Sequence, residues 1–366
     1  MILPLAACLV YYLAALYAAL RFRAPQPAAA GPAPPVSLLK PVSGCDREFY
    51  SCIRSFAAQD YPEFELLFAV RDPADPAISE VRRLAAEFPN RRIEVFLTDR
   101  DYGPNAKVNS MEALRREARH EILLVSDADI RVEPGYLQRV SAPLADPAVT
   151  MVTCPYRGAP AAGLGSILEA LWISTDFQPS VLVARLLGIE AALGATMVFR
   201  RADLDRIGGF APLAAYLADD YQLGHALAGR IMLSDCPVET VLSGGSWAAA
   251  WRHRLRWGRT LRVCRPAGYA GVLITFAIPL ALLTWAVAPA SWPLALAAVA
   301  LRFLVGWLVA RRILRDAAFG RYWPLLPVAD CVSFAIWLTS LFGRTVVWRG
   351  TRFRLRGDGR LEPTPS

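Results

Sequence analysis

The chain has 366 residues, enough for one large domain or two ordinary ones. Its residues are 55% hydrophobic and only 20% charged, and the formal net charge at pH 7 is +8. This balance is too apolar for an ordinary soluble enzyme and too charged for a bundle made only of membrane helices, and it excludes a disordered chain. Seven cysteines with no CxxC motif and no paired spacing argue against a disulfide scaffold and a structural zinc site.

The first apolar segment runs from Ile2 to Leu20 without a charge, which is long enough to cross a bilayer. Arg21 and Arg23 follow it directly. Positive charges after the apolar run favour an uncleaved anchor over a cleaved signal peptide, and they place the following residues in the cytoplasm. We therefore predict a transmembrane anchor at residues 1–22, followed by a proline-rich linker at residues 23–35.

Short β-rich runs alternate with helical patterns between residues 36 and 265. The expected strands are 36–39, 65–70, 92–97, 121–126 and 149–154, and the expected helices are 46–58, 77–88, 107–118 and 134–144. This alternation predicts an α/β domain with a mostly parallel sheet that is covered on both faces. In such sheets ligands bind beyond the carboxyl ends of the strands.

Polar residues follow three of these strands. The first strand runs into Lys40, the second is followed by Asp72, and the fourth opens onto Asp127 and Asp129. Two carboxylates one residue apart after a buried strand suit a divalent cation, because hard cations take oxygen ligands and share them with substrate phosphates. An Asx turn at the end of the strand is the alternative for this pair alone. The three strand ends together favour the metal site.

Lysine is scarce in this chain. Only Lys40 and Lys107 occur among 40 basic residues, so the other 38 are arginine. A lysine ammonium is a compact point charge, whereas the arginine guanidinium is a wide planar fork. The two lysines therefore indicate positions where the fork does not fit, such as a nucleotide pocket, although chance survival explains either one alone.

A second apolar region occupies residues 266–348. We expect spans at about 269–288 and 292–310, separated by Pro289 and Pro293, and a third at about 323–347. Arg302 and Asp330 lie inside these segments, where they would pair, face a polar cavity, or extend to the interface. With the N-terminal anchor, four crossings would leave the basic tail at 349–366 outside the cytoplasm, against the positive-inside bias. Either one segment is re-entrant or the tail breaks that bias.

The apolar segment at about 161–193 contains too many charged residues for a clean span; they are Glu169, Asp176, Arg185 and Glu190. We expect helices in the plane of the membrane interface, forming the lip through which a lipid acceptor enters, with an ordinary core helix as the alternative. Several arginines just before the second apolar region should face anionic headgroups; they are Arg252, Arg254, Arg259, Arg262 and Arg265. Their juxtamembrane position argues against nucleic-acid binding.

Polar motifs follow one another along the middle region in a recognisable order: Lys40-Pro41, Asp72, Lys107 with Asn109, Asp127 with Asp129, Asp219-Asp220, and His253-Arg254-Leu255-Arg256-Trp257. This series resembles the membrane-bound inverting glycosyltransferases of the family 2 type. The match is best to the ceramide glucosyltransferase branch. Within that branch, residues 37–46 and 257–262 look like the bacterial hopanoid-biosynthesis glycosyltransferase.

The resemblance implies a GT-A fold, a UDP-sugar donor, bound Mg²⁺ or Mn²⁺, and inversion at the anomeric carbon. It makes Asp220 the general base, Asp129 the main metal ligand, and Asp127 a ligand of both metal and nucleotide. Nucleotide or diphosphate contacts are implied for six further residues: Lys40, Asp72, Lys107, His253, Arg256 and Trp257. His253 departs from the family pattern, which has glutamine or arginine at that position. A neutral histidine can donate one hydrogen bond but is not a fixed cation, so the implied diphosphate contact rests more on Arg256 than on His253.

The resemblance also implies a function. The expected reaction moves a sugar, N-acetylglucosamine or else glucose, from a UDP-sugar to the hydroxyl of a membrane lipid, here a hopanoid such as bacteriohopanetetrol. Ceramide or sphingoid glucosylation is the alternative, and a polysaccharide synthase is less favoured because three C-terminal spans are few for a secretion channel. A non-catalytic transporter or scaffold would not need these polar motifs. The expected location is the inner membrane as a multi-pass protein, with the catalytic domain in the cytoplasm.

Overall fold

The computed structural model describes residues 2–23, 33–46, 48–242, 244, 246–348 and 350–364. The chain forms two compact units that interleave along the sequence. Unit 1 contains Met1–Arg23, Tyr156–Ile189 and Leu242–Ser366, and unit 2 contains Ala24–Pro155 and Glu190–Val241. Residues 156–189 and 242–265 thus group with the apolar helices, so the extent of the functional domain at 36–265 stays a prediction. Most of the predicted linker, residues 24–32, lies outside the described residues.

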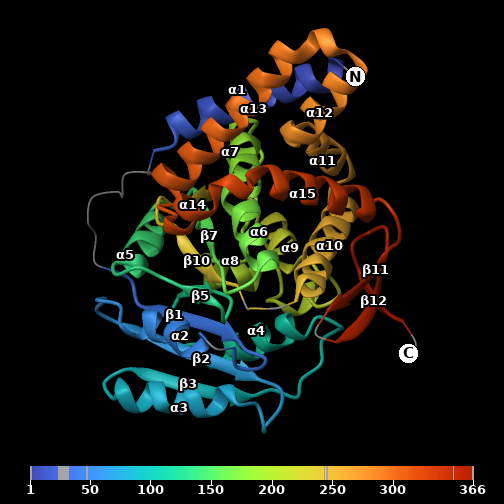
Figure 1. Ribbon diagram of the computed structural model, residues 1–366. Coiled ribbons are helices and arrows are strands. Elements are labelled where there is room, and N and C mark those ends of the chain that lie inside the picture. The colour runs from blue at the N-terminus through green and yellow to red at the C-terminus, as the bar shows by residue number, and fades with distance from the viewer. Residues whose placement is uncertain are drawn as a thin grey trace. The chain divides into compact units, whose positions relative to one another are not determined.

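Unit 2 is built on a seven-stranded sheet in the order β3-β2-β1-β4-β8-β6-β9 (Figure 1). β1 pairs in parallel with β2 and β4, β2 with β3, and β6 with β9, whereas β8 is antiparallel to both of its neighbours. The strands are β1 (Val36–Pro41), β2 (Phe64–Val70), β3 (Arg92–Leu97), β4 (Ile122–Val125), β6 (Val149–Thr153), β8 (Met197–Arg200) and β9 (Arg230–Leu233). The five predicted strands and the mostly parallel pairing are confirmed. β8 and β9 were not predicted.

Helices connect the strands of unit 2. They are α2 (Phe49–Ala57), α3 (Ala77–Glu87), α4 (Ala106–Glu117), α5 (Tyr136–Ser141) with η1 (Ala142–Ala145), α8 (Arg201–Arg206), η3 (Ala211–Leu213) and α9 (Asp219–Leu227). The four predicted ones are confirmed as α2, α3, α4 and α5 with η1, whereas α8, η3 and α9 were not predicted. A small antiparallel pair, β5 (Ile130–Arg131) and β10 (Val238–Val241), follows the end of β4.

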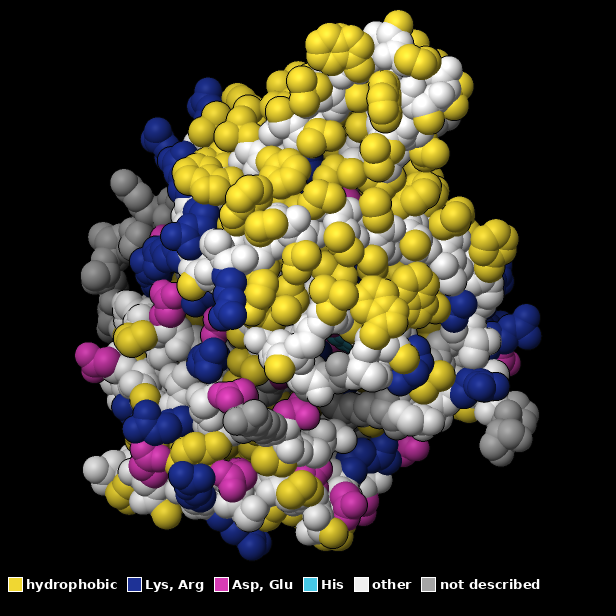
Figure 2. Space-filling model, viewed as in Figure 1, with side chains coloured by type: hydrophobic (Ala, Val, Ile, Leu, Met, Phe, Trp, Pro, Cys, Tyr) yellow, Lys and Arg dark blue, Asp and Glu magenta, His cyan; other side chains and the backbone are white. Residues whose placement is uncertain are grey.

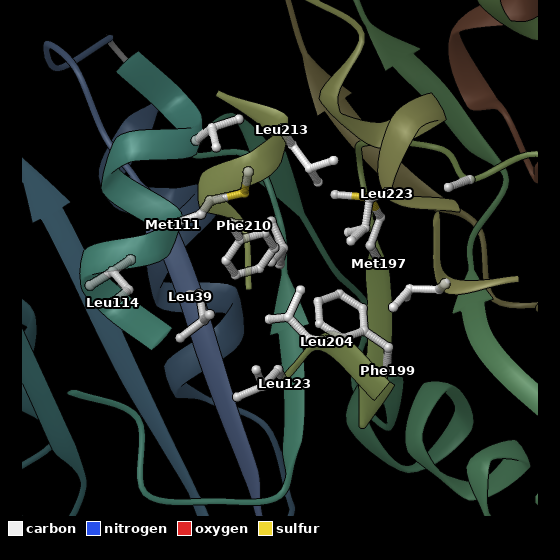
Figure 3. Packing of buried hydrophobic residues seen from close by; sticks show 14 of the residues in the cluster. Leu39, Met111, Leu114, Leu123, Met197, Phe199, Leu204, Phe210, Leu213 and Leu223 are labelled. Carbon is white, nitrogen blue, oxygen red and sulfur yellow. The ribbon is translucent and has the colours of Figure 1, made fainter. Parts of the chain in front are cut away.

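The core of unit 2 fixes α4 against the sheet. Leu39 of β1 and Leu123 of β4 pack with Met111 and Leu114 of α4, and Phe199 of β8 completes the layer (Figure 3). Burying a side chain of this size stabilises the fold by about 1.5–3 kcal/mol relative to leaving it exposed. The packing therefore sets where α4 begins relative to the end of β4, and both of these positions carry candidate site residues.

Unit 1 contains the apolar helices. They are α1 (Ile2–Arg21), α6 (Leu164–Trp172), η2 (Ile173–Phe177), α7 (Gln178–Leu186), α10 (Trp247–Cys264), α11 (Pro266–Gly271), η4 (Val272–Thr275), α12 (Ala277–Val287), η5 (Pro289–Ser291), α13 (Trp292–Leu308), η6 (Val309–Ile313), α14 (Ala317–Tyr322), η7 (Trp323–Leu325) and α15 (Leu326–Ser340). Among the residues that the structure describes, three helical segments are long and apolar enough to cross a membrane: Ile2–Arg21, Pro289–Ile313 and Ala317–Ser340. Pro266–Thr275 and Ala277–Val287 form a fourth candidate, bent by 66°.

The C-terminal part of unit 1 differs from the prediction. The third expected span, at 323–347, is wrong in its last residues, because the helix ends at Ser340. The chain then forms a three-stranded antiparallel sheet of β11 (Thr345–Trp348), β12 (Thr351–Leu355) and β13 (Leu361–Pro363). Val346, Phe353, Leu355 and Leu361 are buried on one of its faces. The alternation of arginine with apolar residues in 352–355 was the available signal for a strand.

The charged segment at 161–193 also takes a definite form. α6, η2 and α7 follow one another without a break, and most of their side chains are buried. Leu168 and Leu171 pack against Ala310 and Leu326 in one cluster. These helices therefore pack within unit 1, and their lying in the plane of the membrane interface stays a prediction.

Arg302 and Asp330 form a buried ion pair between α13 and α15. Arg302 Nε lies 2.9 Å from Asp330 Oδ2, and Nη2 lies 2.6 Å from Oδ1. Nη1 donates to the carbonyl of Thr175 at 2.9 Å, and Arg302 is only 1% exposed. Of the three readings left open by the sequence, the structure selects pairing.

Removing one member of this pair is expected to destabilise unit 1. In Asp330→Asn or Arg302→Met, the partner stays buried with less compensation, which costs about 3–5 kcal/mol for buried pairs. The double variant Arg302→Met/Asp330→Leu should recover much of that loss. The measurement is the midpoint of thermal denaturation in detergent, with the exposed Arg312→Met as control. Single variants as stable as the control would contradict a structural role for the pair.

Candidate active site

The end of β4 presents two carboxylates to the candidate site. Buried residues Ile122–Val125 lead into the turn that contains Asp127 and Asp129, and β5 starts directly after it. The backbone of Asp129 is fixed, because its carbonyl accepts from the N–H of Val241 at 2.9 Å. Burial, and then the neighbouring Asp127 carboxylate, raise the pKa of Asp129 to about 7. The nearby positive charge is therefore too small to offset the effects of burial and of Asp127 on the Asp129 carboxylate.

Lys107 joins this turn to the start of α9. Its Nζ lies 2.8 Å from Asp127 Oδ1 and 3.3 Å from Asp219 Oδ2. Burial acts to lower the pKa of Lys107, but the carboxylates of Asp127 and Asp219 outweigh it and raise the pKa above its ordinary value. Lys107 is thus a permanent cation between two of the predicted acidic motifs.

The start of α4 aims Lys107 at these acids. The side chain of Asn105 caps the helix by accepting from the backbone N–H groups of Lys107 and Val108 at 3.0 and 3.1 Å, and its amide donates to the Tyr216 carbonyl at 2.7 Å. Gly103 approaches the segment before α9 so closely that a Cβ would lie 2.8 Å from the carbonyl oxygen of Ala214. The turn at 103–109 is therefore held directly against the chain that leads to Asp219 and Asp220.

Asp220, the predicted general base, lies in the first turn of α9. Its Oδ2 accepts from the backbone N–H of Gly194 at 3.1 Å, and its Oδ1 accepts from that of Tyr221 at 2.7 Å. A Cβ at position 194 would lie only 3.1 Å from Oδ2, so glycine permits this approach. Burial, and then the adjacent Asp219, raise the pKa of Asp220 to about 6. A partly buried carboxylate with this pKa is suited to accept a proton near neutral pH.

Lys40 lies behind the turn that carries the carboxylates. It is fully buried, its Nζ donates to the carbonyl of Asp127 at 3.0 Å, and the ammonium lies 3.5 Å from the centre of the Phe56 ring. Burial lowers the pKa of Lys40 to about 7. We therefore propose that Lys40 acts on the nucleotide through the position of Asp127 and not by direct contact.

Lys40→Met tests this positioning role. Methionine keeps most of the side-chain volume but cannot donate to the Asp127 carbonyl, so the expected result is about a tenfold higher KM for donor and metal with a smaller change in kcat. Arg71→Met, an exposed change at the end of β2, is the control. A loss confined to kcat, or unchanged kinetics, would contradict it.

Asp72 follows β2 and is exposed. Its Oδ1 accepts from the N–H of Ala74 at 2.8 Å, which is an Asx turn. β2 is separated from β4 by β1, so Asp72 lies at the same edge of the sheet as the Asp127 turn, two strands away. A contact between Asp72 and the base or ribose of a nucleotide stays a prediction.

The residues present fit a hard divalent cation. Among the described residues, no group of three or more histidine, cysteine, aspartate or glutamate side chains gathers into a complete metal cage. Mg²⁺ and Mn²⁺ need fewer protein ligands, because they commonly bind one or two carboxylates and take the other ligands from water and substrate phosphates. Asp127 shares one oxygen with Lys107, and Asp129 lacks compensating charge. This chemistry supports Asp129 as the main ligand and Asp127 as the second.

His253, Arg256 and Trp257 belong to unit 1, whereas the other predicted site residues belong to unit 2. The spacing i, i+3, i+4 places the three on one face of α10. His253 Nδ1 lies 2.6 Å from Glu169 Oε1, and the Trp257 ring packs edge-on against Trp172 at 5.7 Å. The carboxylate orients the imidazole so that Nε2 is directed away from Glu169.

Some residues of these arrangements were not predicted. Glu169 was noted only as a charge that made a membrane span improbable, and Asp219 only as the neighbour of Asp220. Asn105 sits two residues before Lys107, and the pattern of a capping residue before a helix was the signal that could have found it. Gly194 had no such signal, because its closeness to Asp220 depends on the tertiary fold.

Comparison with known proteins finds relatives that are described as glycosyltransferases. The profile of the family described as "Glycosyl transferase family 21" matches residues 1–361. Ceramide glucosyltransferase 1 of Caenorhabditis elegans is 32% identical over 202 residues, which cover 54% of this chain and 42% of that protein. Ceramide glucosyltransferase of Pyricularia oryzae is 23% identical over 428 residues, covering 91% and 86%. The match thus spans less than half the length of the nematode relative.

A solved structure shows the same fold. The mannosyltransferase from Pyrobaculum calidifontis in complex with GDP-Man and Mn²⁺ has a TM-score of 0.55 and 19% identity, with 93% of this chain and 96% of that chain covered. The predicted GT-A fold is confirmed by this likeness.

Proposed function

Because the chain belongs to glycosyl transferase family 21, we propose that it transfers a sugar from a nucleotide-diphosphate donor to the hydroxyl of a membrane lipid. The observation that supports this most is the position of Lys107, whose ammonium joins the Asp127 carboxylate to the Asp219-Asp220 pair. Lys107 thereby lies between Asp127, one of the two carboxylates proposed to bind the metal, and the acidic pair that contains Asp220, the proposed base, whose pKa is raised.

The proposed reaction is a direct displacement with inversion. The acceptor oxygen attacks the anomeric carbon, the bond from that carbon to the diphosphate oxygen breaks, and the hydroxyl proton passes to Asp220. Nucleoside diphosphate leaves with the bonding electrons. A positioned carboxylate base contributes about 10²–10⁴-fold to such a step.

Charge on the departing diphosphate requires compensation. Lys107 supplies one fixed cation beside Asp127. A divalent cation on Asp129 and Asp127 would supply electrostatic stabilisation of the leaving group when it is bound. We propose Arg256 as a further diphosphate ligand. His253, oriented by Glu169, would contribute a hydrogen bond there, and a positive charge only when protonated. Trp257 would support both residues of this motif through its packing.

The donor and the acceptor are chosen from the relatives. Those named above are ceramide glucosyltransferases, so we propose UDP-glucose and a ceramide or related sphingoid as the substrates. The expectation of N-acetylglucosamine and a hopanoid rests on two sequence segments alone, and the relatives favour the ceramide alternative.

The location follows from the apolar helices of unit 1. Arg21 and Arg23 follow α1, and Arg311, Arg312 and Arg315 follow α13. We propose that both groups lie on the cytoplasmic side of the inner membrane, because positively charged flanks are retained there. UDP-sugars are cytoplasmic metabolites, so the active site would share their compartment.

A matrix of donors and acceptors tests the proposal. Membranes containing the protein are incubated with Mg²⁺ or Mn²⁺, UDP-glucose or UDP-N-acetylglucosamine, and ceramide or bacteriohopanetetrol, and glycolipids are identified by mass spectrometry. The expected product is glucosylceramide, absent in membranes with Asp220→Asn. N-acetylglucosaminyl hopanoid instead would overturn the substrate assignment. The absence of any UDP-sugar-dependent glycolipid would overturn the proposed function.

A further inference from the structure

In unit 1, α12 and α13 form a helical hairpin. α12 and α13 pack against each other and are joined by the short turn η5 (Pro289–Ser291). The segment before α12 and the end of α13 therefore both lie away from that turn. Figure 1 shows the N-terminal end of α1 beside the turn, with α1 and α13 running together toward their basic ends.

The start of the segment 317–340 stays near the basic end of α13. Only three residues separate η6 from α14. Phe319 of α14 and Leu326 at the start of α15 pack in one cluster with Ala310.

The end of the segment lies beside the start of α11. Trp337 Nε1 donates to the carbonyl of Tyr269 at 3.1 Å, and the Tyr269 hydroxyl donates to the Trp337 carbonyl at 2.7 Å. Just beyond α15, the carbonyls of Leu341 and Gly343 accept from the guanidinium of Arg262. A crossing helix would instead end near the 289–291 turn.

One face of α15 is apolar and exposed. Val328 is 44% exposed, Leu338 46% and Phe342, just beyond the helix, 69%, and Cys331 lies on the same stripe. Asp330 and Ser333 point the other way and are buried. Figure 2 shows hydrophobic side chains gathered over α1, α12, α13 and α15, with dark blue basic side chains at the margin.

The sheet that follows carries a basic outer face. Val347 is paired with Arg352, and Thr345 with Arg354, so these four side chains share the exposed face opposite Phe353. Among the described residues of 341–364, five arginines stand against Asp358 and Glu362, and Glu362 is paired with Arg354. Apolar residues next to such an arginine excess match the boundary between acyl chains and anionic headgroups.

We propose that residues 317–340 do not cross the membrane but lie in its plane, and that the β11–β13 sheet rests on anionic lipid headgroups. Three crossings then remain: α1, the bent pair that ends in α12, and α13. The C-terminus lies on the same side as Arg21 and Arg311. The basic tail follows the positive-inside bias, and the conflict created by four crossings disappears.

Depth measurements separate the two arrangements. Nitroxide labels are placed one at a time at 328, 331, 338 and 342 in the full-length protein in vesicles. Cys45→Ser and Cys264→Ser remove the other accessible native thiols among the described residues, and Cys331→Ser is added when the label is at 328, 338 or 342. An in-plane helix predicts equal depths, read from accessibility to oxygen and to a polar nickel chelate. A crossing helix predicts a difference of about 21 Å between positions 328 and 342, from 14 residues at a rise of about 1.5 Å. That gradient would overturn the proposal, as would alkaline phosphatase activity of a C-terminal fusion in place of fluorescence from a green fluorescent protein fusion.

A second experiment tests the lipid surface. A label at 347 is compared in neutral phosphatidylcholine vesicles and in vesicles that also contain phosphatidylglycerol. The anionic lipid is expected to immobilise the label, and Arg352→Glu/Arg354→Glu should abolish that effect. Arg82→Glu/Arg230→Glu, an equal charge change on exposed residues of unit 2, should preserve it. An equal response of both double variants, or no response to anionic lipid, would overturn the docking of the sheet.

Discussion

Asp220→Asn is expected to lower kcat by about 10²–10⁴-fold, because an amide cannot accept the acceptor's hydroxyl proton. The volume and the hydrogen bond from Gly194 are largely preserved, so the midpoint of thermal denaturation should change little. KM for the donor should also change little, since the base acts on the acceptor. The measurement is the rate of glycolipid formation at saturating donor and acceptor.

The same residue predicts the acid side of the pH profile. Asp220 must be deprotonated to act as a base, and its pKa is raised to about 6 by burial and by Asp219. Activity should therefore fall about tenfold per pH unit below about 6 and level off above it. Asp205→Asn, an exposed acid of unit 2, should retain the wild-type profile. Full activity of Asp220→Asn would show that Asp220 is not the general base.

Lys107→Met is expected to reduce kcat/KM by about 10²–10³-fold and to weaken donor binding. Without the ammonium, Asp127 and Asp219 face each other with no cation between them, and the diphosphate loses one positive contact. Breaking a buried ion pair also costs stability, about 3 kcal/mol here, because Asp219 is 8% exposed at its side chain. The measurements are donor titrations and thermal denaturation in detergent.

The conservative variant sharpens this prediction. Lys107→Arg keeps the charge but introduces a wider group into a position bounded by two carboxylates, so it should restore stability more than activity. Arg116→Met removes a half-exposed cation from the same helix and is the matched control. If Lys107→Arg were as active as wild type, the compact shape of the lysine would be irrelevant. If Lys107→Met matched the control, the link between the acidic motifs would have no role.

The strands of unit 2 were predictable because each is a short apolar run between turn residues. β1, β2, β3, β4 and β6 were found within about two residues of their observed ends. β8 and β9 were missed, since Met197–Arg200 and Arg230–Leu233 are four residues each and adjoin helical patterns. Such short runs carry too little periodicity to separate strand from helix.

The candidate site shows the same division at the level of side chains. The expectation that Asp127, Asp129 and Asp220 act in metal binding and catalysis was read from their motifs. That Lys107 contacts both Asp127 and Asp219 was not, because those residues are 20 and 112 positions away along the chain, and only the packing of α4 on β1 and β4 brings them together. Lys40 looked equivalent to Lys107 in the sequence, yet it is buried behind the Asp127 turn.

The sequence by itself determined that an α/β domain with acidic motifs is combined with apolar terminal segments, because composition and local hydrophobic periods are properties of short stretches. It also showed that 38 of the 40 cations are arginine and that many of them flank apolar segments. Only the tertiary structure decided that Arg302 pairs with Asp330 and that the basic tail forms a sheet. It also decided that α15 returns to Tyr269 and Arg262. These outcomes depend on contacts between residues far apart in the chain, which no local pattern specifies.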